Sequence, residues 1–317
     1  MLSELPYVAF LAAILVLVPL PWYWRAKNVA TLSLMAWLFV VNVIYGVDSI
    51  LWHDSVVVVV PVWCDITTRI IIGAQMALPA ACMCICIHLE QVASGRQART
   101  LRSEKQRRQI IEAVLCFLVP VVWMALHYTV QGHRFDIIEG YGCRPNTYVS
   151  IPAIIIIWVP PLVLATITLI YAALAFHYFL RRRITFAKYL ESSGLTTSRY
   201  LRLMLMSVVL MVMGVVSTSF TLWYSSLSLR PWTGWASVHS DFSRIAQFPL
   251  VLVSVDVRRY YYVIWMIIPV SSFIFFLFFA FGRDAMLEYR AFVAWIRRSV
   301  LSACSFAHNS SILPSVR

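Results

Sequence analysis

The sequence predicts an all-α membrane protein, a bundle of seven transmembrane helices with the N-terminus outside and the C-terminus in the cytosol. Of the 317 residues, 61% are hydrophobic and only 13% are charged. The apolar residues also fall into seven runs long enough to cross a bilayer. A soluble domain carries about a quarter charged residues, so this composition argues against a water-soluble globular enzyme.

Each predicted helix is a run of about 20 or more apolar residues, which crosses a hydrocarbon core about 30 Å thick. The runs lie approximately at residues 5–24, 29–52, 62–89, 110–131, 151–180, 203–226 and 260–281. A further apolar run, Ile245–Val255, is too short to span, and we interpret it as part of a loop or as an outward extension of the last helix. A signal peptide is disfavoured for the first run, because that run lacks a basic n-region and a clear cleavage site.

The basic residues set the predicted orientation. The loops after the first, third and fifth runs and the C-terminal segment hold 19 of the 26 Lys and Arg residues, whereas the opposite side holds six. Cytoplasmic loops carry such an excess of positive charge. We therefore expect a seven-transmembrane receptor domain over residues 1–281 and a short cytosolic tail over residues 282–317. The net charge of +12 then marks the cytosolic face, and no nucleic-acid partner is expected.

The cysteines divide into two groups. Cys64 and Cys143 fall on the outer side, where a disulfide can persist, and a bridge is favoured over two free thiols because no other cysteine lies outside. Cys82, Cys84 and Cys86 precede a histidine near the inner end of the third run. Residues at i and i+2 point to different sides of a helix, so small packing residues are favoured over a metal site.

Arg69 is the most unusual residue within a predicted span. Asp65 lies four residues earlier and can pair with it along one helix face, and Asp48 is a second potential partner. An ionisable residue inside the membrane indicates a functional site by default. We leave two roles open for Arg69, contact with a ligand or a structural lock between the second and third spans. Asn42 and Gln75 are interpreted as interhelical hydrogen-bonding residues.

Prolines interrupt four of the predicted spans, and each can kink its helix because it frees a backbone carbonyl. They are Pro79, Pro120, Pro160, Pro161 and Pro269. An enzyme is not expected, because the sequence contains no H-E-x-x-H, G-x-S-x-G or P-loop motif. No lysine lies in the seventh run, so a retinal Schiff base there is excluded.

Four blocks of sequence carry a resemblance to a known family. They are residues 21–30 (PWYWRAKNVA) continuing to Trp52, residues 63–65 (WCD) with 78–82 (LPAAC) and 88–90 (HLE), the loop from Arg181 to residues 195–204 (LTTSRYLRLM), and Trp235 with residues 238–245 (VHSDFSRI). Together they resemble the fungal mating-pheromone receptors of the a-factor, or lipopeptide, type, which are class D G-protein-coupled receptors. The resemblance covers nearly all of residues 5–290 and is strongest to basidiomycete members. Members of this family often carry a longer polar C-terminal region than the one expected here.

The resemblance implies a plasma-membrane receptor for a farnesylated peptide pheromone that acts on a heterotrimeric G protein. Its ligand contacts are expected among Trp63, Asp65, Arg69, His239 and Asp241, and its G-protein contacts at the inner ends of spans five and six, at Arg181, Arg182, Arg183, Arg199 and Arg202. Membrane lipids are expected partners, no cofactor or metal is expected, and a homodimer is left open. The alternative is a small polytopic transporter or channel, which would need a polar path across the bundle.

Overall fold

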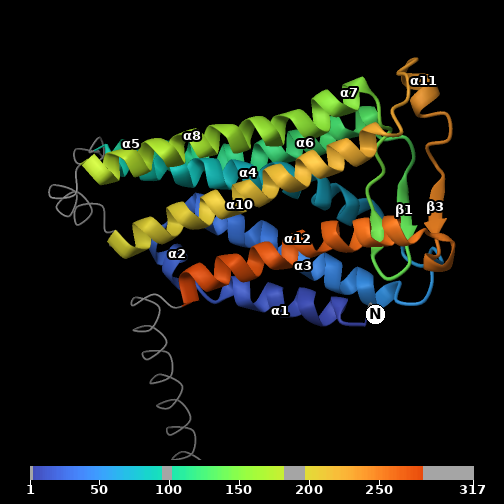
Figure 1. Ribbon diagram of the computed structural model, residues 1–317, viewed down its shortest axis with the longest axis horizontal. Helices are drawn as coiled ribbons and strands as arrows, with labels where there is room; N and C mark the ends of the chain where they lie inside the picture. Colours follow the sequence, from blue (N-terminus) through green and yellow to red (C-terminus); the bar gives the residue numbers. More distant parts are fainter. Residues whose placement is uncertain (1–2, 95–101, 182–196, 281–317) are drawn as a thin grey trace, which may run out of the picture.

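The computed structural model describes residues 3–94, 102–181 and 197–280, whose helices run side by side along one axis (Figure 1). In these ranges seven helices are long and apolar enough to cross a membrane: Leu5–Ala26, Val29–Leu51, Pro61–Ala93, Ser103–Val130, Ile151–Arg181, Tyr200–Ser226 and Val255–Phe279. One predicted run corresponds to each, so the predicted bundle of seven membrane-spanning helices is confirmed, while the orientation of its termini stays a prediction. The sequence reasoning set the start of the last span five residues too late, because charged residues occupy its first turn.

The spans are built from several helical segments, and a small sheet lies at one end of the bundle (Figure 1). The α-helices are α1 (Leu5–Leu17), α2 (Leu20–Ala26), α3 (Val29–Leu51), α4 (Pro61–Ala93), α5 (Arg102–Ala113), α6 (Val119–His127), α7 (Ile151–Ala153), α8 (Val159–Arg181), α10 (Thr197–Ser226), α11 (Trp235–Val238) and α12 (Val255–Ala280). The strands are β1 (Phe135–Ile138), β2 (Gly142–Arg144) and β3 (Ile245–Phe248). Two π-helical turns, Val114–Leu118 and Ile154–Trp158, precede α6 and α8.

Local sequence explains the breaks in the first span. Proline has no amide hydrogen and cannot continue a helix's hydrogen-bond ladder, and α1 gives way to α2 at Pro19. Lys27 then takes a left-handed conformation, with φ of 51°, which ends α2. The side chain of Asn28 caps the next helix by accepting a hydrogen bond from the amide of Thr31 at 3.1 Å.

A proline also shapes the fourth span. Pro120 follows the π-helical turn Val114–Leu118 and has no amide hydrogen to donate to the carbonyl of Cys116. The indole Nε1–H of Trp37, on α3, donates to that carbonyl at 3.0 Å. The second and fourth spans are thereby joined at a backbone oxygen that proline leaves without its usual partner.

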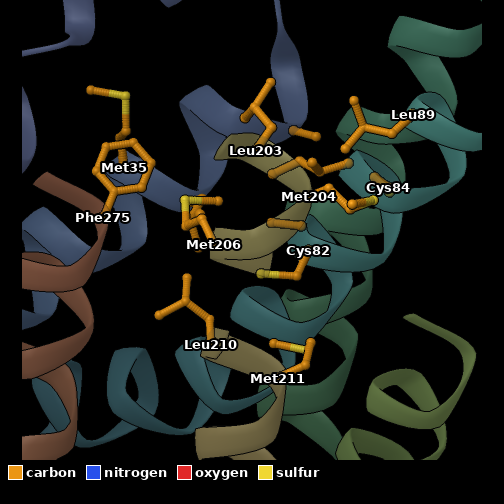
Figure 2. Close-up of a cluster of buried hydrophobic side chains, with 14 of the residues drawn as sticks. Met35, Cys82, Cys84, Leu89, Leu203, Met204, Met206, Leu210, Met211 and Phe275 are labelled. Carbon is orange, nitrogen blue, oxygen red and sulfur yellow. The ribbon is translucent and has the colours of Figure 1, made fainter. Parts of the chain in front are cut away.

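The inner half of the bundle is a closely packed core. α4 packs against α3, α6, α8 and α10, and Figure 2 shows its cysteines among methionines and leucines of α10. Cys82 and Cys84 are buried in this cluster, as expected of packing residues. The interhelical role of Asn42 is confirmed, since its side-chain amide donates to the hydroxyl of Ser272 at 2.8 Å. Gln75 instead lines a cavity.

The loops at the end of the bundle that is predicted to be the outer one form a three-stranded sheet with strand order β2-β1-β3, which the sequence reasoning did not predict. β1 pairs antiparallel with β2 and parallel with β3. The expectation for Ile245–Val255 is therefore corrected, because its first four residues form β3 and pair with a strand more than 100 positions earlier. Figure 1 shows the sheet beside α11, at the end of the bundle opposite the C-terminal end of α8 and the N-terminal end of α10.

Candidate functional site

A cavity of about 450 Å³ lies inside the bundle and reaches the outer sheet. It is bounded by α3, α4, α8, α10, α12 and the segment that follows β2. Pockets of 300–1,000 Å³ typically hold small ligands, and they combine apolar walls with a few polar groups that orient the ligand. Both kinds of lining are present here, and they lie at opposite ends.

The mouth of the cavity is polar. Asp136 of β1 and Arg144 of β2 face each other across the two strands. The side-chain amide of Asn146 donates to Asp136 Oδ2 at 3.3 Å. The guanidinium of Arg144 lies 4.4 Å from the centre of the Tyr45 ring, as in a cation–π contact. The same guanidinium donates to the backbone carbonyl of Tyr141 at 3.4 Å, and no carboxylate of the described residues lies within ion-pairing distance of it, so it places a positive charge at the mouth.

The floor of the cavity is mainly apolar, and the hydroxyl of Ser271, which also lines it, donates to the backbone carbonyl of Ile267. Leu34 and Leu38 of α3, Leu210 and Met211 of α10 and Ile268 of α12 line it. These side chains belong to, or pack against, the buried cluster that fills the inner half of the bundle. A ligand whose polar end stays at the mouth can therefore bury an apolar part on this floor.

The five predicted ligand contacts do not line the cavity. They lie at the sheet end of the bundle, on the first turns of α4 and in the loop around α11, and we call this end, with the sheet and its loops, the outer cap. The indole of Trp63 donates to Asp48 Oδ1 at 2.7 Å. Asp65 accepts two hydrogen bonds from the guanidinium of Arg134, at 2.8 and 2.5 Å. Both partners proposed for Arg69 are wrong, because neither Asp48 nor Asp65 lies within ion-pairing distance of it among the described residues, and Asp65 pairs with Arg134 instead.

Arg69 and His239 instead meet at Tyr128, in the last turn of the fourth span. The guanidinium of Arg69 lies 5.5 Å from the centre of the Tyr128 ring. His239 stacks on Trp235 at 4.0 Å between ring centres, and its Nε2 lies 3.0 Å from the carbonyl oxygen of Tyr128. These contacts fasten the loop around α11 to the bundle. Asp241 is exposed and lies 3.8 Å from Arg244 in the same loop.

A disulfide positions the cavity mouth. Cys64, near the start of α4, is bonded to Cys143 of β2, with Cα atoms 5.4 Å apart. Arg144 follows Cys143 directly, so the bridge also fixes the position of that side chain. The sequence reasoning missed Asp136 and Arg144 as site residues and counted them only as outer charges. The signal that could have found Arg144 is its position beside an outer cysteine.

The inner ends of α8 and α10 hold the predicted G-protein contacts. Arg181 ends α8 and is exposed, and Arg202 donates to the hydroxyl of Ser198 on its own helix at 2.9 Å. Arg182 and Arg183 lie outside the described residues, and only the helical backbone of Arg199 is described. Tyr200 joins the two helices, because its hydroxyl donates to the Ala175 carbonyl at 3.2 Å.

The Asp65–Arg134 pair should contribute modestly to stability. Asp65→Asn and Arg134→Gln should each lower the free energy of unfolding by about 1 kcal/mol, because both side chains are about a third exposed and solvent screens the pair. Thermal unfolding of the two single variants and the double variant measures the coupling. Fully additive effects would contradict the pairing, and Arg69→Gln tests whether that neighbouring arginine competes for Asp65.

Comparison with known proteins adds the following similarities. The family model described as "Pheromone A receptor" (STE3) matches residues 4–298. The chain is 55% identical over 291 residues to the pheromone B beta 1 receptor of Schizophyllum commune, covering 90% of this chain and 54% of that protein. It is 32% identical to pheromone receptor 1 of Mycosarcoma maydis, covering 90% and 82%. It is 24% identical to the pheromone a factor receptor of Saccharomyces cerevisiae, covering 92% and 61%.

Two further findings limit these similarities. The chain spans about half the length of the Schizophyllum commune relatives that it matches. No solved structure matches the chain.

Proposed function

This chain belongs to the pheromone A receptor (STE3) family, whose members are seven-span membrane receptors rather than enzymes, and we propose that it senses a farnesylated peptide pheromone at the plasma membrane. Ligand binding would act on a heterotrimeric G protein through the inner ends of the fifth and sixth spans. A ligand can shift the equilibrium between the inactive and active conformations of a receptor only if it binds the active conformation more tightly. The site must therefore touch helices whose relative positions can change, and the cavity touches five of them.

The cavity is the observation that carries the proposal. Its mouth offers the guanidinium of Arg144 to a peptide, beside Asp136, whose carboxylate is held by His133 and Asn146. Its floor offers leucine, isoleucine and methionine side chains to an apolar chain. A farnesylated peptide has this same division into a polar and an apolar part. An ordinary hydrophilic peptide would leave the floor unused.

The proposed orientation places the sheet and the disulfide outside the cell. The excess of basic residues on the opposite side supports this placement, as does the preference of disulfides for oxidising compartments. The N-terminus is then outside, and Arg181 and Arg202 face the cytosol.

A transporter or channel fits less well. It needs a polar path through the whole bundle, whereas Leu203, Met204 and Met206 fill the region between the cavity floor and the inner ends of the helices (Figure 2). These side chains are buried and apolar. Closing the inner half of the bundle suits a receptor, which must transmit a change of helix arrangement without passing a solute.

A reporter assay tests the proposal. Cells that express the chain with a pheromone-response reporter are exposed to a panel of candidate peptides, each supplied with and without an S-farnesyl group on its C-terminal cysteine. We expect a response to a prenylated member and a response at least about tenfold weaker to its unprenylated form, since an isoprenoid chain buries many methylene equivalents. Equal responses to both forms, or none across the panel, would count against the proposed function.

The coupling surface yields a separate prediction. Arg181→Ala combined with Arg202→Ala should leave ligand binding unchanged and weaken G-protein activation by about tenfold or more, because charged hydrogen bonds to a partner contribute about 1.5–3 kcal/mol each. Binding and nucleotide exchange are measured on the same membranes. Arg258→Ala with Arg259→Ala, at the other end of the bundle, provides the matched control. A variant pair that exchanges nucleotide as fast as the wild type would remove these residues from the coupling surface.

A further inference from the structure

We propose that the cavity holds an isoprenoid chain inside the helix bundle and that Gly214 of α10 sets the length of chain it admits. The inference rests on the proposed function, because it takes the ligand to be prenylated. It goes further by naming a residue that determines which chain lengths the cavity accepts.

The lining of the cavity extends along several helices, over a length that suits an extended chain. It is lined from Leu34 to Tyr45 on α3 and from Ile71 to Cys82 on α4. On α12 the lining runs from Tyr260 to Ser271. Each of these stretches covers eleven helical steps, or about 16 Å at 1.5 Å per residue. Three helices therefore give the same depth of about 16 Å to a cavity of about 450 Å³, and the lining on α10, from Leu210 to Ser225, extends further toward the mouth.

The charged groups lie at one end of this length, and the side chains at the other end are mainly apolar, with Ser271 as a polar member. Arg144, Asp136 and Asn146 lie at the mouth, and Ser217 and Thr218 of α10 follow below them. Leu38 and Leu210 lie at the floor. An apolar chain attached to a polar peptide can satisfy this gradient in one orientation only, with the chain pointing inward, because burying the peptide on the floor would leave its amides without partners.

Gly214 opens the lower part of the cavity. A Cβ atom built on it meets no atom within 4 Å, although the residue lines the cavity one turn from Leu210. Close packing explains two other helical glycines, since a Cβ on Gly73 would lie 2.0 Å from Met124 and one on Gly46 would lie 2.7 Å from Phe10. Glycine disfavours a helix, and no such contact requires it at position 214. The missing side chain leaves space for a ligand.

Binding to the full chain in lipid nanodiscs tests the inference. The probes are S-farnesylcysteine methyl ester and the shorter S-geranylcysteine methyl ester, competing with a fluorescent farnesyl analogue. We expect the wild-type chain to prefer the farnesyl probe by at least about tenfold, since a single methylene in a hydrophobic pocket already changes affinity by about tenfold and the two probes differ by a whole isoprene unit. Gly214→Leu should abolish or reverse that preference by blocking the floor, and Gly214→Ala should give an intermediate ratio.

The matched control is Val216→Leu, which enlarges a side chain on the same helix that is 64% exposed and lies outside the cavity lining. It should keep the wild-type ratio. An unchanged ratio in Gly214→Leu, or an equal change in Val216→Leu, would overturn the inference.

A second measurement uses the wild-type chain, so its outcome does not depend on whether Gly214→Leu folds. A farnesylcysteine probe with a diazirine in its terminal isoprene unit should label Cys82, Leu210 or Met211. Label confined to lipid-facing positions such as Val212 and Val216 would place the chain outside the bundle and overturn the inference. The reporter assay and these two binding measurements can fail separately. A chain that selects isoprenoid length but gives no pheromone response would refute the proposed function and leave this inference standing.

Discussion

Chains that lack Cys64 or Cys143 should lose most of their folded, ligand-binding population. The bridge closes a loop with a sequence separation of 79 residues. In the chain-entropy model a loop of that size contributes about 4.5 kcal/mol. That amount is large beside the 5–15 kcal/mol of stability that is typical of folded proteins.

The structural reason is that the bridge holds the outer sheet on the bundle. Both cysteines are fully buried, in a cluster with Trp52, Phe135 and Ile137. Losing the bond would free β2 and with it the guanidinium of Arg144 at the cavity mouth. We therefore expect affinity for the prenylated peptide to fall together with the thermal unfolding midpoint.

Cys64→Ala, Cys143→Ala and the double variant should behave alike, because each removes the same bond and the effects of coupled residues do not add. Cys86→Ala, which removes a buried thiol from the inner core, is the matched control and should have a smaller effect. Peptide mapping under non-reducing conditions measures the bond directly. A free thiol at either position in folded chain, or wild-type binding by a single variant, would show that the cap does not depend on the bridge.

Gly142→Ala should be the most damaging single methyl addition in the outer cap. Gly142 has φ of +75°, and a Cβ atom there would lie 2.3 Å from Cβ of Asp48. A left-handed non-glycine residue costs about 1–3 kcal/mol, and overpacking costs about 1–3 kcal/mol more. We expect the free energy of unfolding to fall by about 2–5 kcal/mol, with weaker ligand binding because Arg144 is displaced.

Gly234→Ala separates the two causes. Gly234 also has a positive φ, of +140°, but a Cβ atom there meets nothing within 4 Å. It should therefore show the cost of backbone strain alone, about 1–3 kcal/mol. Thermal unfolding of the two variants measures both losses of stability. An equal loss in both would mean that the close approach of Asp48 to position 142 adds nothing to the cost of the methyl group.

Residue spacing predicted contacts less well than it predicted spans. Asp65 and Arg69 are four residues apart on α4, a spacing at which opposite charges can pair. In the structure Asp65 pairs with Arg134 instead, because the loop before β1 places the Arg134 guanidinium where it donates to both carboxylate oxygens. Spacing along one helix shows only that two side chains can meet. It does not show which third group arrives from elsewhere in the chain.

The sheet and the cavity were missed for a related reason. β3 pairs with β1 across more than 100 residues, and its short apolar sequence is equally compatible with a loop or a helical extension. Arg144 and Asp136 read as ordinary outer charges until the strands set them opposite each other. Gly214 carries no signal in the sequence, because only the neighbouring helices show whether space or a packed side chain lies beside it.

The sequence by itself determined the number of spans and the family, because the length of an apolar run and the presence of a motif are local properties of the chain. Only the tertiary structure decided which carboxylate each arginine meets, where the outer strands pair and where space remains between helices. Those features depend on side chains that are distant in sequence and that folding brings within a few ångströms of one another.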